Sequence, residues 1–293
     1  MRIIRGKSRA RGGDCRMTDP LSPHRRVEVT RIKRAGRDSG TDMVATEEPL
    51  EVRLHGKPFA VIMRTPGADR ELAAGFLLSE GILRSSADLG AVEHCRHPHH
   101  PEVHNIVDVY FLGDAAASVE RNLQERRNVL TNSSCGLCGR VTIDSLRLQA
   151  SPLPIRWTMT REVAASLPVR LRERQAVFDE TGGLHGAAVF GLDGTCVASA
   201  EDVGRHNAAD KVIGAMLLAD RLPLDTHAIA VSGRASFEIV QKAWLAGISL
   251  VCAVSAPSSL AVELAHEAGI TLLGFVRDEG FNLYTHPSRI AAL

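Results

Sequence analysis

Residues 227–276 decide the fold and read HAIAVSGRASFEIVQKAWLAGISLVCAVSAPSSLAVELAHEAGITLLGFV. Three apolar runs rich in Val, Ile, Leu and Ala predict buried strands over His227–Val231, Ile248–Val254 and Ile270–Val276. Between them, Ser236–Ala246 and Pro257–Ala268 have the length and spacing of helices. Strands that alternate with helices of about ten residues are typical of a partly parallel sheet covered on both faces. The stretch therefore predicts an α/β protein.

The flanking sequence extends this sheet. Leu184–Leu192 and Thr195–Ala200 are predicted strands joined by a turn at Asp193–Gly194, and a helix is expected over Ala208–Ala219. A last strand is expected near Asn282–Tyr284. A helix is also expected over Thr158–Phe178, kinked or divided at Pro168.

Upstream, compact structure is expected to begin near residue 45. Leu50–Leu54 and Phe59–Arg64 form a predicted hairpin, Asp69–Glu80 a helix, and His104–Leu112 a strand. We therefore expect four parts: a basic, disordered extension over 1–44, a smaller β-rich α+β part over 45–130, a flexible loop over 131–140, and an α/β domain over 141–293.

Composition narrows the class of protein. The 293 residues are 44% apolar and 24% charged, as in soluble globular proteins, and no stretch approaches the roughly 20 apolar residues of a membrane helix. The first residues lack the apolar core of a secretion signal. We expect a cytoplasmic protein without a membrane partner.

Charge is distributed unevenly along the chain. Residues 1–37 hold 12 basic and 3 acidic residues, whereas the remainder holds 23 basic and 31 acidic residues. The acidic body has no basic stripe with interleaved aromatic residues, so nucleic-acid binding is not expected.

The segment TNSSCGLCGR at 131–140 is the most unusual in the chain. Ser and Asn before Cys135 are good helix N-caps, and a helix starting there would favour thiolates on Cys135 and Cys138. Arginines on both sides strengthen this effect, at positions Arg126, Arg127 and Arg140. The spacing alone fits redox chemistry and sulfur transfer equally well. Structural zinc would need further ligands, and two buried core thiols fit the polar, Gly-rich surroundings least.

A second cluster, HCRHPHHPEVH at 94–104, is rich in histidine. Its two prolines and lack of regular spacing favour a solvent-exposed insertion over a metal site. We expect the protein itself to hold no metal.

Three segments lie where a predicted strand gives way to a helix: Glu201–Ala208, Val231–Glu238 and Ser255–Ser259. In α/β proteins, ligands bind at the carboxyl ends of strands. Arg205 and Arg234 there supply cationic donors suited to phosphate, and exposed backbone N–H groups add to them. Together with His185 and His206, they predict a pocket for an anionic ligand with several phosphates.

The element order from residue 184 onward resembles the cytidine deaminase fold, a three-layer α/β/α sheet. Deaminases require a Glu two residues after the site His and two zinc-binding cysteines. Ala187 and the Ser232–Ser236 stretch stand at those positions, so zinc-dependent deamination is not expected.

Several motifs in order resemble the formate dehydrogenase accessory sulfurtransferase family, of the FdhD type, from about residue 45 to the end. They are Ser134–Gly139, Gly183–Gly186, Glu201–Asn207, Asp210–Lys211, Ser232–Arg234, Phe275–Gly280 and Asn282–Tyr284. The basic leader and the His-rich insertion lie outside the pattern.

This resemblance implies a sulfur carrier. It would take sulfur from a cysteine desulfurase and pass it to the molybdenum cofactor bis(molybdopterin guanine dinucleotide) before that cofactor enters formate dehydrogenase. Cys135 matches the persulfide-bearing cysteine and Cys138 its partner thiol. The cofactor-contact loop matches Phe275, Val276, Arg277, Asp278, Glu279 and Gly280. The resemblance also implies a homodimer. The alternatives are a non-catalytic chaperone for the same cofactor and a dithiol–disulfide redox protein.

Overall fold

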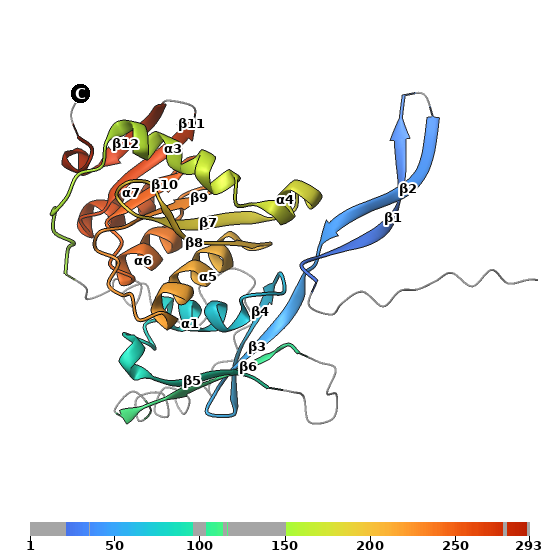
Figure 1. The fold of residues 1–293 in the computed structure, drawn as a ribbon, viewed down its shortest axis with the longest axis horizontal. Helices are drawn as coiled ribbons and strands as arrows, with labels where there is room; N and C mark the ends of the chain where they lie inside the picture. The colour runs from blue at the N-terminus through green and yellow to red at the C-terminus, as the bar shows by residue number, and fades with distance from the viewer. Residues whose placement is uncertain are drawn as a thin grey trace, which may run out of the picture.

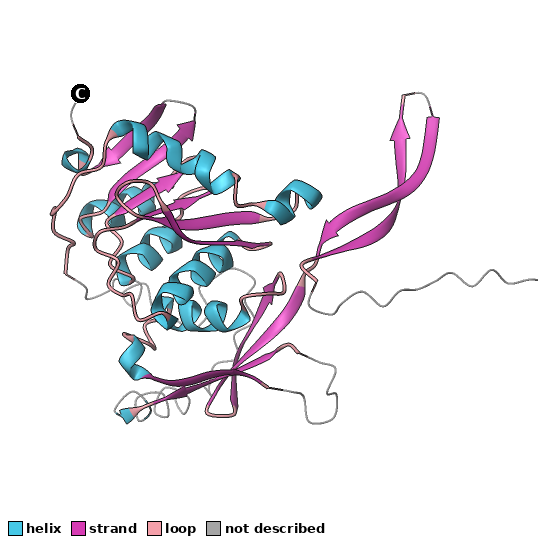
Figure 2. Cartoon of the chain, in the orientation of Figure 1, coloured by secondary structure: helices cyan, strands magenta, loops and turns pink. Residues whose placement is uncertain are grey.

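A computed structural model describes residues 22–34, 36–95, 104–113, 116, 151–277 and 280–291. It has a mixed α/β fold, as the sequence predicts (Figure 1, Figure 2). Within these residues, no helix has the length and apolar character needed to cross a membrane.

The larger sheet has six strands in the order β12-β11-β10-β9-β7-β8. Its parallel centre consists of β9 (Ala228–Val231), β10 (Leu250–Ala253) and β11 (Thr271–Arg277). Antiparallel strands flank this centre: β7 (His185–Phe190), β8 (Cys196–Asp202) and β12 (Gly280–Thr285). The predicted strands are thus all present, and the apolar runs are buried because helices cover both faces.

Two core clusters lie on the two faces of this sheet. On one face, Ala187, Ile229 and Val251 pack with helices α5 (Arg205–Leu218), α6 (Phe237–Leu245) and α7 (Ser259–Glu267). On the other face, Ala188, Ala230 and Cys252 pack with α3 (Arg161–Arg172). A short helix, α4 (Ala176–Thr181), follows α3 and leads to β7.

A smaller sheet has the order β4-β3-β6-β5, with β3 (Glu48–Leu54), β4 (Lys57–Arg64), β5 (Leu89–His94) and β6 (Ile106–Phe111). Helix α1 (Asp69–Ser79) lies between this sheet and α5 (Figure 1). Short 3-10 turns occur at Ser86–Asp88 and Pro287–Arg289. Leu50, Val107 and Leu72 belong to the same core cluster as α5 and α6, so the two expected parts share one core.

The contact between α1 and α5 depends on two glycines. A Cβ at Gly75 would lie 2.0 Å from the carbonyl oxygen of Asp210, and one at Gly214 would lie 1.9 Å from that of Glu71. Such distances are far below van der Waals contact. The helices therefore approach closely because neither glycine has a side chain.

The structure corrects the expectation of disorder over residues 22–44. Strands β1 (His24–Lys33) and β2 (Gly36–Ala45) form an antiparallel hairpin that projects from the body (Figure 1). Its dense charge suggested disorder, but backbone pairing along both strands can order such a sequence. Residues 1–21 lie outside the described residues.

Two further elements of secondary structure differ from the prediction. The expected helix over Thr158–Phe178 is two helices, and α3 continues through Pro168 and ends at Arg172. Strand β5 was not predicted. Its sequence, LGAVEH, contains a Gly and only one β-branched residue, so its pattern was too weak to indicate a strand.

Candidate functional site

Three of the predicted ligand residues, His185, Val276 and Arg277, line one cavity at an edge of the six-stranded sheet. The first residue of β7, His185, pairs with Asp202 at the end of β8. Ser232 follows the carboxyl end of β9, and Arg277 ends β11. The antiparallel orientation of β7 therefore brings His185 to the edge where the parallel strands end, as the sequence predicts.

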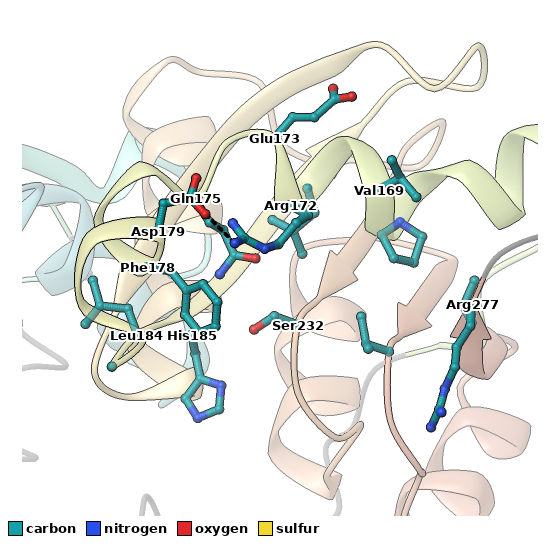
Figure 3. A pocket seen from close by; sticks show the side chains of 16 residues that line it. Val169, Arg172, Glu173, Gln175, Phe178, Asp179, Leu184, His185, Ser232 and Arg277 are labelled. Atoms are coloured by element: carbon teal, nitrogen blue, oxygen red, sulfur yellow. Dashed lines mark hydrogen bonds and ion pairs between the residues drawn. The ribbon is translucent and has the colours of Figure 1, made fainter. Parts of the chain in front are cut away.

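A cavity of about 880 Å³ opens at this edge (Figure 3). Its charged, polar and aromatic lining residues are Arg172, Glu173, Gln175, Phe178, Asp179, His185, Ser232 and Arg277. Figure 3 shows Phe178 and His185 on one side, Arg277 on the other, and Ser232 between them. The cavity has the size of a small-molecule site and combines apolar walls with two guanidinium groups and two carboxylates, of which Arg172 and Asp179 pair with each other.

Local hydrogen bonds hold the start of β7 against the loop after β9. The Gly186 N–H donates to Oγ of Ser232 at 2.9 Å, and the Ser232 N–H donates to the Gly186 carbonyl at 2.9 Å. A Cβ at Gly186 would lie 2.7 Å from Cδ of Gln175, so only glycine fits there without displacing the glutamine. These contacts fix two lining residues, His185 and Ser232.

The helical wall of the cavity carries an aromatic ring and a guanidinium. The Arg172 guanidinium carbon lies 4.7 Å from the centre of the Phe178 ring, and Arg172 also forms an ion pair with Asp179. At the start of α4, the Glu201 carboxylate accepts from the N–H groups of Val177 at 3.0 Å and Phe178 at 2.8 Å. Glu201 thus positions this wall rather than the ligand.

Arg205 lies beside His185 at the first turn of α5. A Cβ at Gly233 would be 3.5 Å from Nδ1 of His185 and 3.9 Å from Cδ of Arg205, so the three residues meet at one point. Burial lowers the pKa of His185, and the positive charge of Arg205 lowers it further. The buried Nε of Arg205 has no hydrogen-bond acceptor among the described residues. An anionic ligand would satisfy this cationic group.

His206 lies in a different cavity, of about 390 Å³, on the side of α5 that faces β4. Its Nε2 is 3.1 Å from Oγ of Ser236 and 3.7 Å from the Glu238 carboxylate. Burial, reinforced by the charges of Arg205 and Lys242, lowers the pKa of His206 to about 4. His206 thus lines the smaller cavity, whereas its neighbour Arg205 lies beside His185 and lines neither cavity.

The predicted contact loop is also divided. Val276 and Arg277 line the larger cavity, whereas Phe275 is 39% exposed and lines neither cavity. Phe275 has a left-handed backbone (φ 54°) at an irregularity in β11, and Gly280 begins β12. Asp278 and Glu279 lie outside the described residues. Arg234 is exposed and lines neither cavity.

The predicted catalytic pair, Cys135 and Cys138, lies outside the described residues, as does most of the His-rich segment. The described cysteines are the free thiols Cys95, Cys196 and Cys252. Complete burial raises the pKa of Cys252 far above its usual range, so this thiol is not a nucleophile. Across the described ranges, no group of three or more His, Cys, Asp or Glu residues could hold a metal ion.

Sequence reasoning missed Arg172, Gln175 and Phe178, which it assigned to an ordinary helix. The available signal was their position just before Gly182 and Gly183, which lead directly into His185. A helix joined to a site strand by such a short turn must lie beside the site.

The motif around residues 201–211 has a second role at the junction with the N-terminal part. Lys211 and Asp202 form a buried ion pair of 2.7 Å, and Lys211 also donates to the Thr65 carbonyl at 2.8 Å. The Thr65 N–H donates to Asp202 at 3.1 Å, and the Asn207 amide donates to the Met63 carbonyl at 2.8 Å. These contacts join α5 to the segment between β4 and α1.

Residues 45–291 match the model of the FdhD/NarQ family. The chain belongs to this family. Its members include "Sulfur carrier protein FdhD" of Streptomyces avermitilis, to which the chain is 48% identical over 276 residues, covering 91% of this chain and 95% of the relative. The corresponding protein of Saccharolobus solfataricus is 42% identical over 269 residues, covering 91% and 98%. These FdhD relatives support a sulfur-carrier role for the chain.

The fold also matches a solved structure. A chain described as a formate dehydrogenase accessory protein from Desulfotalea psychrophila superimposes with a TM-score of 0.72. The two chains are 23% identical, and the match covers 92% of this chain and 100% of the other. This likeness supports the α/β fold found here.

Proposed function

We propose that this protein is a sulfurtransferase that carries sulfur as a persulfide on Cys135. The donor is a cysteine desulfurase. The acceptor is the molybdenum cofactor bis(molybdopterin guanine dinucleotide), before its insertion into formate dehydrogenase. Membership of the FdhD/NarQ family and the sulfur-carrier relatives support the sulfur chemistry. Arg277 in the sheet-edge cavity, with Arg205 beside the cavity, supports an anionic acceptor.

The observation that carries the acceptor assignment is the grouping of cationic donors around this cavity. Arg172 and Arg277 line it, and Arg205, whose buried Nε has no acceptor among the described residues, lies beside the lining residue His185. Guanidinium groups suit phosphates because they present several N–H donors in a fixed plane. The Phe178 ring offers a flat apolar wall for a guanine or pterin ring. The residues present therefore fit a ligand with a planar base and several phosphates.

In the first step, the Cys135 thiolate attacks the outer sulfur of the donor persulfide. The donor S–S bond breaks, its cysteine leaves as a thiolate, and a new S–S bond forms on Cys135. This exchange involves no net oxidation, and it is fast only when Cys135 is ionised and accessible.

Cys138 can serve the second step in two ways. If the Cys138 thiolate attacks the outer sulfur of the Cys135 persulfide, the persulfide moves to Cys138 and the Cys135 thiolate is freed. Attack on the inner sulfur instead closes a Cys135–Cys138 disulfide and releases hydrosulfide, after which a thiol reductant must supply two electrons to restore both thiols. A trapped disulfide after single turnover distinguishes the second route from the first.

Replacing Cys135 by Ala separates sulfur transfer from simple delivery of the cofactor. We expect formate dehydrogenase activity to be lost in cells that carry Cys135→Ala at normal protein level, because the persulfide cannot form. Retained activity would contradict the transfer mechanism and favour a chaperone.

The acceptor site can be tested with guanosine diphosphate as a probe, because the cofactor carries guanine dinucleotide arms. Replacing Arg277 by Ala removes a charged donor from the cavity, and we expect about tenfold weaker binding by calorimetry. Arg174→Ala is the matched control, because Arg174 is exposed and outside the cavity lining. Equal affinity of both variants would contradict this site.

We further propose that two copies form a homodimer, as the family resemblance implies. Sedimentation velocity is expected to give a dimer of 31.6 kDa subunits. A monomer at every protein concentration would contradict this.

A further inference from the structure

The smaller cavity lies in a groove beside β4, an edge strand of the four-stranded sheet. β4 pairs with β3 on one side and with none of the described strands on the other. Two of its apolar side chains are strongly exposed, Val61 at 64% and Met63 at 49%. An exposed apolar edge strand is a template for pairing with another extended segment.

The direction of the backbone groups on this edge follows from one contact. The Met63 carbonyl accepts from the Asn207 side chain of α5, so it faces away from β3. In a strand, the backbone groups of alternate residues face the same side. The N–H and carbonyl of Val61 therefore face the groove.

The groove has a negative charge. Its titratable lining residues are Glu47, Glu80, His206, Asp210, Glu238 and Lys242. The Lys242 ammonium donates to both oxygens of Asp210, at 2.7 and 2.8 Å, and this pair is close to neutral. The low pKa of His206, about 4, leaves it uncharged at neutral pH, and Glu47 and Glu238 give the groove a negative charge. Arg205 lies on the same turn of α5 but is not part of the lining.

The described chain begins beside this groove. The Thr46 N–H donates to the Pro23 carbonyl at 2.9 Å, and Glu47 is the next residue. Residues 2–16 lie upstream and contain six basic residues, one acidic residue and the apolar pair Ile3–Ile4. Because an extended chain spans about 3.3 Å per residue, this segment can reach the full length of β4.

We propose that residues 2–16 of this chain bind in the groove as an extended segment paired with β4. Ile3 and Ile4 would cover Val61 and Met63, and the basic side chains would face Glu47 and Glu238. Main-chain pairing to an edge strand supplies affinity, and the charged groove supplies selectivity. The assignment is independent of the proposed sulfur transfer.

Hydrogen–deuterium exchange of the full chain, read at single residues, tests this directly. We expect the Val61 amide to exchange about tenfold more slowly in the unmodified chain than in a variant with serine at all six basic positions. Those positions are Arg2, Arg5, Lys7, Arg9, Arg11 and Arg16. Raising the salt concentration is expected to remove the same protection without any substitution, because the attraction is electrostatic.

Charge-matched variants give the control. The double variant Glu47→Gln/Glu238→Gln should increase the exchange rate of the Val61 amide. The control variant Glu263→Gln/Glu267→Gln, which changes two exposed residues of α7, should leave this amide protected. The exchange rates of the β5 amides, at the opposite edge of the sheet, should be the same in all variants. Equal exchange in all variants would overturn the proposal. Protection that persists without the basic residues would also overturn it and assign the edge to another occupant, such as a second copy.

Discussion

Gly75 and Gly214 determine how closely α1 and α5 can pack. We predict that Gly214→Ala lowers the free energy of unfolding by about 1–3 kcal/mol, although alanine is the better helix former. The reason is the 1.9 Å approach of the new Cβ to the Glu71 carbonyl. Urea denaturation measures the effect. Gly280→Ala is the control, because a Cβ there meets nothing within 4 Å. Equal stabilities of the two variants would contradict the close helix contact.

His206 should make stability depend on pH. Its pKa is about 4 in the folded protein and 6.5 as the ordinary value, so the unfolded chain binds more protons between these values. Stability is therefore fully present above about pH 6.5 and is lost as the pH falls toward 4. The free energy of unfolding should fall between about pH 7 and pH 5, and we predict that His206→Gln makes this fall smaller by up to about 2 kcal/mol. Urea denaturation at both pH values measures the effect. An unchanged pH slope would show that His206 titrates normally.

The larger site could be predicted only in part from individual residues. His185 and Arg277 could be placed in advance because each lies where a strand meets a loop, and loops at one sheet edge converge. Arg172 and Phe178 could not, because their helix meets the site through tertiary packing. The sequence analysis also grouped His206 with His185, whereas the structure places His185 in the larger cavity and His206 in the smaller one.

The junction between α5 and the β4–α1 segment depends on the buried ion pair of Asp202 and Lys211. We predict that Asp202→Asn lowers the free energy of unfolding by about 3–5 kcal/mol, because it leaves a buried ammonium without its counterion. Asp225→Asn breaks the exposed pair with Arg156 and should change stability by less than about 1 kcal/mol. Thermal unfolding of both variants provides the comparison. Similar effects would mean that the junction is solvated.

At the scale of elements, the apolar runs of β9, β10 and β11 and their intervening helices were predictable because local pattern and burial agree. The β1–β2 hairpin and β5 were not. Their strands carry charged or small residues and owe their form to cross-strand pairing, which a linear pattern does not show. The expected division of the Thr158–Phe178 helix at Pro168 was also misplaced, because α3 accommodates Pro168 and ends only at Arg172, before α4.

For the whole molecule, the sequence predicted an α/β protein with its ligand edge at the strand termini, and the structure confirms that class. It did not predict that the N-terminal part shares a core with the larger domain. The shared core depends on contacts between residues far apart in sequence, such as Thr65 with Asp202 and Gly75 with Asp210. The likeness to deaminases and the roles of Cys135 and Cys138 stay predictions.

Intact-mass spectrometry of the full chain after incubation with a cysteine desulfurase and free cysteine tests the central claim most directly. We predict a gain of about 32 Da, one sulfur atom, that a thiol reductant removes and that Cys135→Ala abolishes. Cys252→Ala, which removes a buried thiol, should leave the gain intact. No gain in the unmodified chain, or the same gain in Cys135→Ala, would contradict a persulfide carried on Cys135.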